Sequence, residues 1–254
     1  MVRFRNLVCM KKLGFLLLLV VQLIACTKKP DTIVDTNPTG KINIVIENYA
    51  GSQILKLNDE WYKNDNGDSL QISVFNYFIS NIKLTRDDGF VYTEPESYHL
   101  VRENSSSTKS FTIENIPPGN YKTISFMIGV DSTRNVSGAQ TGDLDPNSGM
   151  FWDWNTGYIM AKLEGKSPAS SGGMVLYHLG GYSGNSNAIR YVSLSKDIPL
   201  SDKQSKNIHL KADALEWFKT PTTIKIKDID VVSANSTKII ADNYADMFSI
   251  DHID

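Results

Sequence analysis

The side chains best suited to metal or ligand chemistry lie around a pair of tryptophans in the middle of the chain. Trp152 and Trp154 are two residues apart, in a stretch bounded by Gly149 and Gly157. On an extended backbone, side chains alternate between two faces, so both indole rings would point to the same side. The pair therefore forms either a large plug in a core or one wall of a binding site.

Four histidines are available as metal ligands, but none pair at a zinc-site spacing, and no His-Glu-x-x-His motif occurs. His178 is the best candidate, because it follows the tryptophan pair and precedes two glycines; a structural histidine at a strand end is the alternative. His252 is a candidate second ligand, unless it belongs to a frayed terminus. His99 is interpreted as structural, and His209, opposite the aliphatic side of its strand, as a surface residue.

Oxygen-bearing side chains gather just before the tryptophans and suggest a second kind of metal site. Hard oxygen ligands suit calcium, and the order Asp-x-Asp-x-Asn at 143–147 resembles the opening of an EF-hand loop. The rest of that pattern is missing, because Trp154 occupies the position of the bidentate glutamate. Asp and Asn also form turns without any ion, which is the alternative interpretation. The candidate calcium ligands are Asp131, Asn135, Asp143 and Asp145.

The N-terminus has the pattern of a bacterial lipoprotein signal peptide. Basic residues precede an apolar run at 13–24, which is too short for a permanent membrane helix. The run ends in Leu23-Ile24-Ala25-Cys26, a lipobox in which the Cys26 thiol accepts the lipid. Residues 1–25 are then removed, and the lipid holds the protein at a membrane. Thr27 favours the outer membrane, with the domain periplasmic or surface-exposed; an ordinary secretory signal with an incidental cysteine is the alternative.

Catalytic patterns are not found in the sequence. The chain has two cysteines; Cys9 would be lost with the signal and Cys26 used by the lipid, which leaves no thiol nucleophile or thiolate ligand. The serine- and glycine-rich stretches at 170–173 and 180–184 are not Gly-x-Ser-x-Gly elbows, and no phosphate-binding glycine loop occurs. We therefore expect a protein that is not an enzyme.

The composition is that of an ordinary globular protein, with 41% hydrophobic and 21% charged residues. The net charge of -2 gives no electrostatic reason to expect nucleic acid as a partner. Residues 26–40 are polar and contain Pro30, Pro38 and Gly40, which is typical of a flexible tether. Residues 41–254 are enough to bury one core and are expected to form one domain.

Short alternating segments predict that this domain is all-β. The clearest alternation places Ile124, Phe126 and Ile128 on one face of a strand. Further strands are expected at 42–46, 70–84, 97–101, 175–179, 189–192, 208–210 and 224–229, with an Asn-Gly hairpin at 64–68. Helical spacing occurs at 212–218 and 239–248. The pattern predicts a β-sandwich of short antiparallel strands, with one or two short helices near the C-terminus.

Three motifs connect this sequence to a known family. They are Gly129-Val130, the Met-Phe-Trp-x-Trp-x-x-Gly-Tyr run at 150–158, and His178-Leu179-Gly180. With them, the chain from about Ile42 to its end resembles the MbnP-like copper-binding protein domain. The resemblance implies copper held by imidazoles and by a tryptophan oxidised to kynurenine, which a partner di-haem oxidase of the MauG type produces. It assigns these roles to His178 and to Trp152 or Trp154.

One position departs from the family pattern. Relatives have a histidine after the asparagine that follows the Gly-Val loop, whereas here Asn135 is followed by Val136. His178 must then find its second imidazole in His252 or His99.

The sequence thus predicts a membrane-anchored lipoprotein that binds copper in the cell envelope. The alternative is a non-catalytic domain of the same fold that lacks the copper site and binds a small ligand or a protein through the tryptophan strand. Val136 favours the alternative, and His178 beside the tryptophans favours copper. Calcium that only stiffens the acidic loop is a third interpretation.

Overall fold

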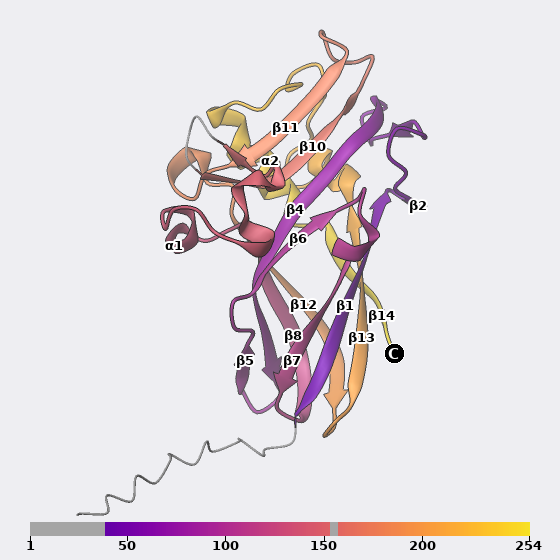
Figure 1. Cartoon of the computed structure of the whole chain (residues 1–254). Coiled ribbons are helices and arrows are strands. Elements are labelled where there is room, and N and C mark those ends of the chain that lie inside the picture. The colour runs from indigo at the N-terminus through magenta and orange to yellow at the C-terminus, as the bar shows by residue number, and fades with distance from the viewer. Residues whose placement is uncertain (1–38, 153–156) are drawn as a thin grey trace, which may run out of the picture. The chain divides into compact units, whose positions relative to one another are not determined.

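The computed structural model describes residues 39–152 and 157–254 (Figure 1). Contacts divide the chain into a unit of residues 1–36 and a unit of residues 37–254. The first unit lies outside the described residues, and with it the predicted signal peptide and Cys26. None of the helices in the described part of the chain has the length and hydropathy needed to cross a membrane.

One sheet of the second unit has five strands, in the order β14-β13-β1-β2, with β7 also paired to β1. Strand β1 alternates strictly, so Ile42, Ile44 and Ile46 are all buried while their neighbours face outward. The pairing of β1 with β13 is parallel, which departs from the antiparallel strands that the sequence predicted. The strands are β1 (Gly40–Ala50), β2 (Gln53–Ile54), β7 (Ser110–Ile116), β13 (Ser205–Asp213) and β14 (Phe248–Ile253).

The other sheet has nine strands built around β4, whose 18 residues make it the longest strand of the described chain. Its main order is β11-β10-β4-β8-β12, and the short strands β3, β5 and β6 pair with β4, while β9 pairs with β10. Figure 1 shows β10 and β11 running beside one end of β4. The strands are β3 (Tyr62–Lys63), β4 (Ser69–Arg86), β5 (Val91–Thr93), β6 (Tyr98–Arg102), β8 (Gly119–Ile128), β9 (Phe151–Trp152), β10 (Gly157–Lys166), β11 (Met174–Gly180) and β12 (Arg190–Leu200).

Aromatic side chains from both sheets meet in the core between them. The ring of Phe248 on β14 packs edge-on against Tyr77 of β4 and Phe126 of β8, with centroids 5.5 and 5.0 Å apart. Edge-to-face pairs at this separation are favourable beyond the area they bury. Both sheets therefore share one core, and the predicted β-sandwich is confirmed.

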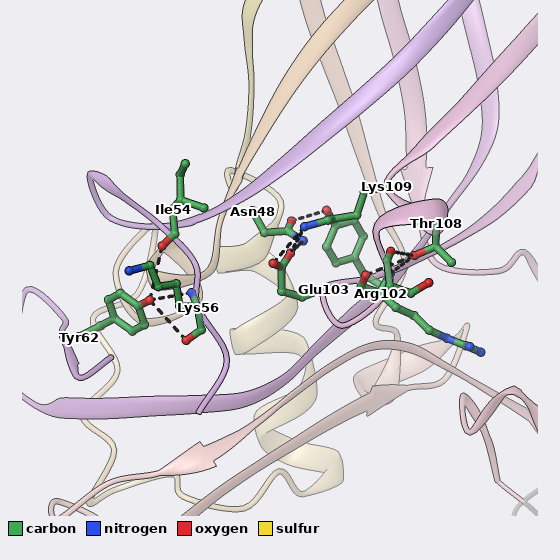
Figure 2. Close-up of polar contacts among 10 residues, drawn as sticks. Asn48, Ile54, Lys56, Tyr62, Arg102, Glu103, Thr108 and Lys109 are labelled. Atoms are coloured by element: carbon green, nitrogen blue, oxygen red, sulfur yellow. Dashed lines mark hydrogen bonds and ion pairs between the residues drawn. The ribbon is translucent and has the colours of Figure 1, made fainter. Parts of the chain in front are cut away.

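A polar cluster around the buried Asn48 also joins the two sheets (Figure 2). The Tyr77 hydroxyl donates to Asn48 Oδ1 of β1 at 2.7 Å, and Asn48 Nδ2 donates to Glu103 Oε2 at 2.8 Å. Lys109 Nζ donates to both oxygens of Glu103 at 3.0 Å, so the carboxylate is paired as well as hydrogen-bonded. Because each group has a partner, Asn48 is tolerated at 1% exposure inside an apolar core.

The helices are short and sit in the connections. They are α1 (Ser132–Asn135), α2 (Ala234–Tyr244) and the 3-10 helices η1 (Ser106–Thr108), η2 (Gly142–Leu144), η3 (Pro146–Ser148), η4 (Gly184–Ser186) and η5 (Ala214–Phe218). The helical turn predicted at 212–218 is confirmed by η5, and the predicted C-terminal helix by α2. Helix α2 starts earlier than expected because Ser233 begins it, with the Ser233 N–H bonded to Ser236 Oγ at 2.9 Å.

One predicted strand is wrong. Residues 224–229 are not a strand, although Ile224 and Ile226 are buried as their alternation predicts. Their N–H groups bond to the carbonyl of Phe218 and to Asp68 Oδ2, so no neighbouring strand receives them. The alternation at 224–229 reflects burial alone. These residues do not form the ladder of backbone hydrogen bonds with a neighbouring strand that would make them a strand. By contrast, the predicted hairpin at 64–68 is confirmed by the pairing of β3 with β4.

Candidate functional site

Strands β9, β10 and β11 bring Trp152 and His178 into one hollow. Trp152 is paired with Gly157 of β10, and His178 is paired with Lys162 of the same strand. Both side chains are half-buried. The hollow has a volume of about 380 Å³, and its lining combines the two motif residues with apolar and small side chains: Trp152, Leu176, His178, Gly180, Gly181, Ser186, Val231, Val232, Ser233, Ala234 and Thr237.

The two glycines after His178 are required by this packing. A Cβ on Gly180 would lie 2.3 Å from the Trp152 ring and 2.9 Å from the carbonyl oxygen of Tyr158. Gly181 has a φ of +97°, and a Cβ there would lie 2.3 Å from the carbonyl oxygen of Ser186. The His-Leu-Gly motif therefore places an indole ring directly on the backbone of β11, next to the imidazole.

His178 faces a carboxylate across the two strands. Its Nε2 lies 2.6 Å from Glu164 Oε1, with the side chains 34% and 26% exposed. A carboxylate that accepts the N–H of one ring nitrogen fixes the tautomer and leaves the other nitrogen, Nδ1, with its lone pair. Lys162 Nζ is 4.0 Å from the same oxygen and donates to the carbonyl of Gly149 at 2.8 Å. Burial lowers the pKa of Lys162, and the Glu164 carboxylate offsets this only in part.

The opposite wall comes from a segment that the sequence did not associate with the site. Leu176 N–H donates to the carbonyl of Asp230 at 2.8 Å, and Val232 N–H donates to the carbonyl of Leu176 at 3.2 Å. This short parallel bridge lays 230–232 along β11 and leads directly into α2. Hydroxyl groups of Ser170 and Ser171 hold the Asp230 carboxylate and lower its pKa. The sequence signal that could have indicated this wall is the pair Val231-Val232, which stands directly before Ser233, the N-cap of α2.

The Gly-Val and Gly-Tyr motifs support the hollow from behind. Gly129 has a φ of +116°, and a Cβ there would meet the Met160 side chain at 3.0 Å. Asn135, only 7% exposed, donates to the carbonyl of Val130 and accepts the Tyr158 N–H at 3.0 Å. Asn135 thus joins the Gly-Val loop to the start of β10. Both polar atoms of its side-chain amide bond to the protein's own backbone, at a residue that the sequence offered as a calcium ligand.

Asp131 also acts within the protein's own hydrogen-bond network. It is the N-cap of α1, where its Oδ1 accepts the Arg134 N–H at 3.2 Å. Its Oδ2 accepts from the Tyr98 hydroxyl and from Asn81 Nδ2. Burial by itself would raise the pKa of Asp131, but these donors together lower it.

The other two aspartates of the predicted calcium site are equally engaged. Asp143 accepts the Leu100 N–H at 2.9 Å, and Asp145 accepts the backbone and side-chain amides of Asn147 at 2.8 and 2.9 Å. Within the described residues, the carboxylates of Asp131, Asp143 and Asp145 are not gathered at metal-binding distances. The bond from the Asn147 N–H to Asp145 is of the Asx-turn kind that the sequence offered as the alternative to calcium.

The remaining predicted ligands do not join His178. His252 lies on β14 of the five-stranded sheet, opposite His209, whereas His178 lies on β11 of the nine-stranded sheet. His99 stacks on Phe111 and bonds to Glu94 Oε2 at 2.9 Å. Trp154 lies outside the described residues.

Val136, the residue at which the sequence was expected to depart from the family pattern, follows α1 and is 67% exposed.

The fold defines an all-β sandwich domain, and the comparisons with known proteins specify its family. The chain belongs to the MbnP family, whose model matches residues 39–239. Among solved structures, it is similar to MbnP from Methylosinus trichosporium, with 12% identity, a TM-score of 0.47, and coverage of 72% of this chain and 78% of that one. No curated protein matches.

Proposed function

We propose that this protein is a non-catalytic lipoprotein of the cell envelope whose MbnP-family domain binds copper in the Trp152–His178 hollow. The observation that carries the proposal is that these two motif residues line the same hollow. Membership of the family supports it. The lipobox at 23–26 supports anchoring through Cys26, with the outer membrane as the destination.

The residues of the hollow fit copper in part. Imidazole is a good copper ligand, and the Glu164 carboxylate 2.6 Å from His178 Nε2 is the kind of outer partner that orients a ligating ring. His178 supplies one nitrogen, and no other histidine lines the hollow in the described chain. In this proposal the second nitrogen comes from an altered side chain, and Trp152, which lines the same hollow, is the candidate.

Oxidation of tryptophan by a di-haem oxidase of the MauG type would create that ligand. Opening of the indole ring takes up two oxygen atoms from two molecules of hydrogen peroxide, which leave as water. Hydrolysis then releases the former ring carbon as formate and leaves kynurenine, whose aromatic amine is a nitrogen donor. Trp152 is half-buried and lines the hollow, and Trp154 is the second candidate for this oxidation.

A second candidate function follows from the exposure of Val136 and the apolar lining of the hollow. Val136 has no donor atom, and Leu176, Val231 and Val232 offer only hydrocarbon. A hollow of about 380 Å³ with an aromatic wall suits a small apolar or aromatic organic ligand. In this version, the MbnP-family domain is a carrier that has lost the metal.

Copper content and intact mass of the full chain, purified in mild detergent from its native envelope, test the proposal. We expect stoichiometric copper, a mass change confined to the peptide with Trp152 and Trp154, and loss of copper in His178→Ala. The matched control is His99→Ala, because His99 also faces a glutamate, Glu94, at 2.9 Å but lies outside the hollow.

Two results would contradict copper binding at this site. One is a wild-type protein that is copper-free and takes up no Cu(I) after reconstitution. The other is a His178→Ala protein that retains as much copper as His99→Ala. A lipid-modified N-terminus in the intact mass checks the anchoring separately, since it does not depend on the metal.

A further inference from the structure

A second group of metal-ligating side chains lies on the other sheet. His209 of β13 and His252 of β14 are directly opposite each other in the antiparallel pairing. Their imidazole rings stack, with centroids 4.0 Å apart and planes within 11° of parallel. A β-bulge follows immediately, between His209 and Leu210, and bulges re-aim side chains beside functional sites.

Asp254 completes the group. Its Oδ1 lies 3.2 Å from His209 Nε2. Asp254 is held in place by its backbone, which exchanges two hydrogen bonds of 2.7 and 3.1 Å with Asn207. Within the described chain, this is the group of three such residues whose donor atoms all lie within 4.8 Å of one another.

We propose that His209, His252 and Asp254 form a binding site for a late first-row divalent cation such as zinc. Two imidazoles and one carboxylate are the protein ligands of many zinc sites, with water in the fourth position. Two nitrogens on one zinc are at most about 4.2 Å apart, twice a bond of roughly 2.1 Å. Donors within 4.8 Å are close to that span, and metal binding needs the two stacked rings to turn toward the ion, for which the His252 side chain, 54% exposed, has room.

The surroundings of His252 support the same assignment. Its Nδ1 lies 2.7 Å from Asp251 Oδ2, so the Asp251 carboxylate accepts that N–H and leaves Nε2 for a metal. Lys211 is the nearby cation, and it pairs with the other oxygen of Asp251 at 2.5 Å. The positive charge of Lys211 is therefore compensated by Asp251. The carboxylate of Asp254 remains to balance the positive charge of the metal.

This site is independent of the Trp152–His178 hollow. The hollow is lined by residues of β9, β11 and α2, whereas the second site lies on β13 and β14 in the other sheet. His252 and Asp254 also fall beyond residue 239, where the match to the family model ends. The inference does not rest on the proposed copper function, and either can fail alone.

Zinc titration of the full chain in detergent, after removal of bound metal and against a colorimetric zinc chelator, tests the inference. We expect one zinc per chain in the wild type and in His178→Gln, which removes the imidazole of the hollow. Asp251→Asn should weaken binding about tenfold, as the loss of an outer partner does, and His252→Gln should weaken it further. His99→Gln is the control for a histidine that belongs to neither site.

A direct measurement covers any variant that folds poorly. In the wild type, zinc should shift the imidazole NMR signals of His209 and His252 and leave those of His178 and His99 unchanged. The inference is overturned if the wild type takes up no zinc at tens of micromolar, if His252→Gln binds as tightly as wild type, or if zinc shifts only His178. Copper loss in His178→Ala with zinc binding intact would support both sites separately.

Discussion

The acidic loop at 131–145 and the Trp152–His178 hollow both have residue types suited to metals. They differ in whether the donor atoms of these residues are already used in hydrogen bonds within the protein. In the loop, oxygen atoms of Asp131, Asp143 and Asp145 already accept N–H or O–H groups of the protein. In the hollow, His178 lies beside open space with one ring nitrogen directed to Glu164. The comparison shows that ligand type alone does not define a site, because the donor atoms must also remain available.

The hollow should be the more fragile of the two regions. Gly180→Ala puts a Cβ 2.3 Å from the rigid Trp152 ring and 2.9 Å from a backbone oxygen, so one of them must move. Overpacking of this kind lowers the free energy of unfolding by about 1–3 kcal/mol. Urea unfolding measures the loss, and tryptophan fluorescence should report a shifted Trp152 environment.

Gly172→Ala is the matched control for that substitution. Its Cβ would meet no atom closer than 4.0 Å, so the unfolding free energy should stay within about 0.5 kcal/mol of wild type. If both alanine variants are equally stable, the indole is not packed against β11 as described, and the difference between the two regions weakens.

A substitution in the loop should lower the free energy of unfolding by less, and the size of this loss should depend on pH. Asp131→Ala removes the N-cap of α1 and the acceptor for Tyr98 and Asn81, at a cost of about 1–2 kcal/mol near pH 7. The pKa of Asp131 is lowered in the folded state, so its stabilisation is present above the unfolded-state pKa and disappears as pH falls through the folded-state value. Chemical unfolding of the wild type and of Asp131→Ala should give unfolding free energies that converge as the pH falls from 7 to 2.

Added calcium tests the same difference between the loop and the hollow. Because the loop oxygens accept hydrogen bonds from the protein, added calcium should not raise the melting temperature of the wild type. A calcium-dependent rise that Asp131→Ala abolishes would show that the loop can exchange these bonds for an ion.

A small effect on stability is expected at Glu164. Glu164→Gln removes the carboxylate facing His178 in a partly exposed pair, which should change the unfolding free energy by less than about 1 kcal/mol. Copper affinity should nevertheless fall about tenfold, because the outer partner that orients the ring is lost. Stability and copper affinity that fall in parallel would indicate a structural pair instead of a ligand-orienting one.

The sandwich was predictable because its signal is local. The alternation of Ile124, Phe126 and Ile128 requires only that one face of β8 is buried, and all three are. The hairpin at 64–68 and the helix near the C-terminus follow from turn chemistry and spacing over a few residues. The shared hollow of Trp152 and His178 was anticipated through family motifs rather than through periodicity.

What the sequence could not supply is pairing between distant strands. His252 faces His209 because β14 is paired with β13, and a change of register would place another residue there. The parallel contact of 230–232 with β11, which closes the hollow, likewise depends on a pairing over more than fifty residues. The alternation of Ile224 and Ile226 misled because burial in a loop and burial in a strand select the same side chains.

Strand β1 has a mechanical consequence if the domain is lipid-anchored as proposed. It begins at Gly40, the last residue of the predicted tether, and is bonded along one edge to β13 and along the other to β7. A pull applied ahead of Gly40 acts along the strand, whereas its hydrogen bonds run across it. The bonds of both ladders therefore share the load in shear instead of opening one after another, so the domain should resist tension applied through the proposed lipid anchor.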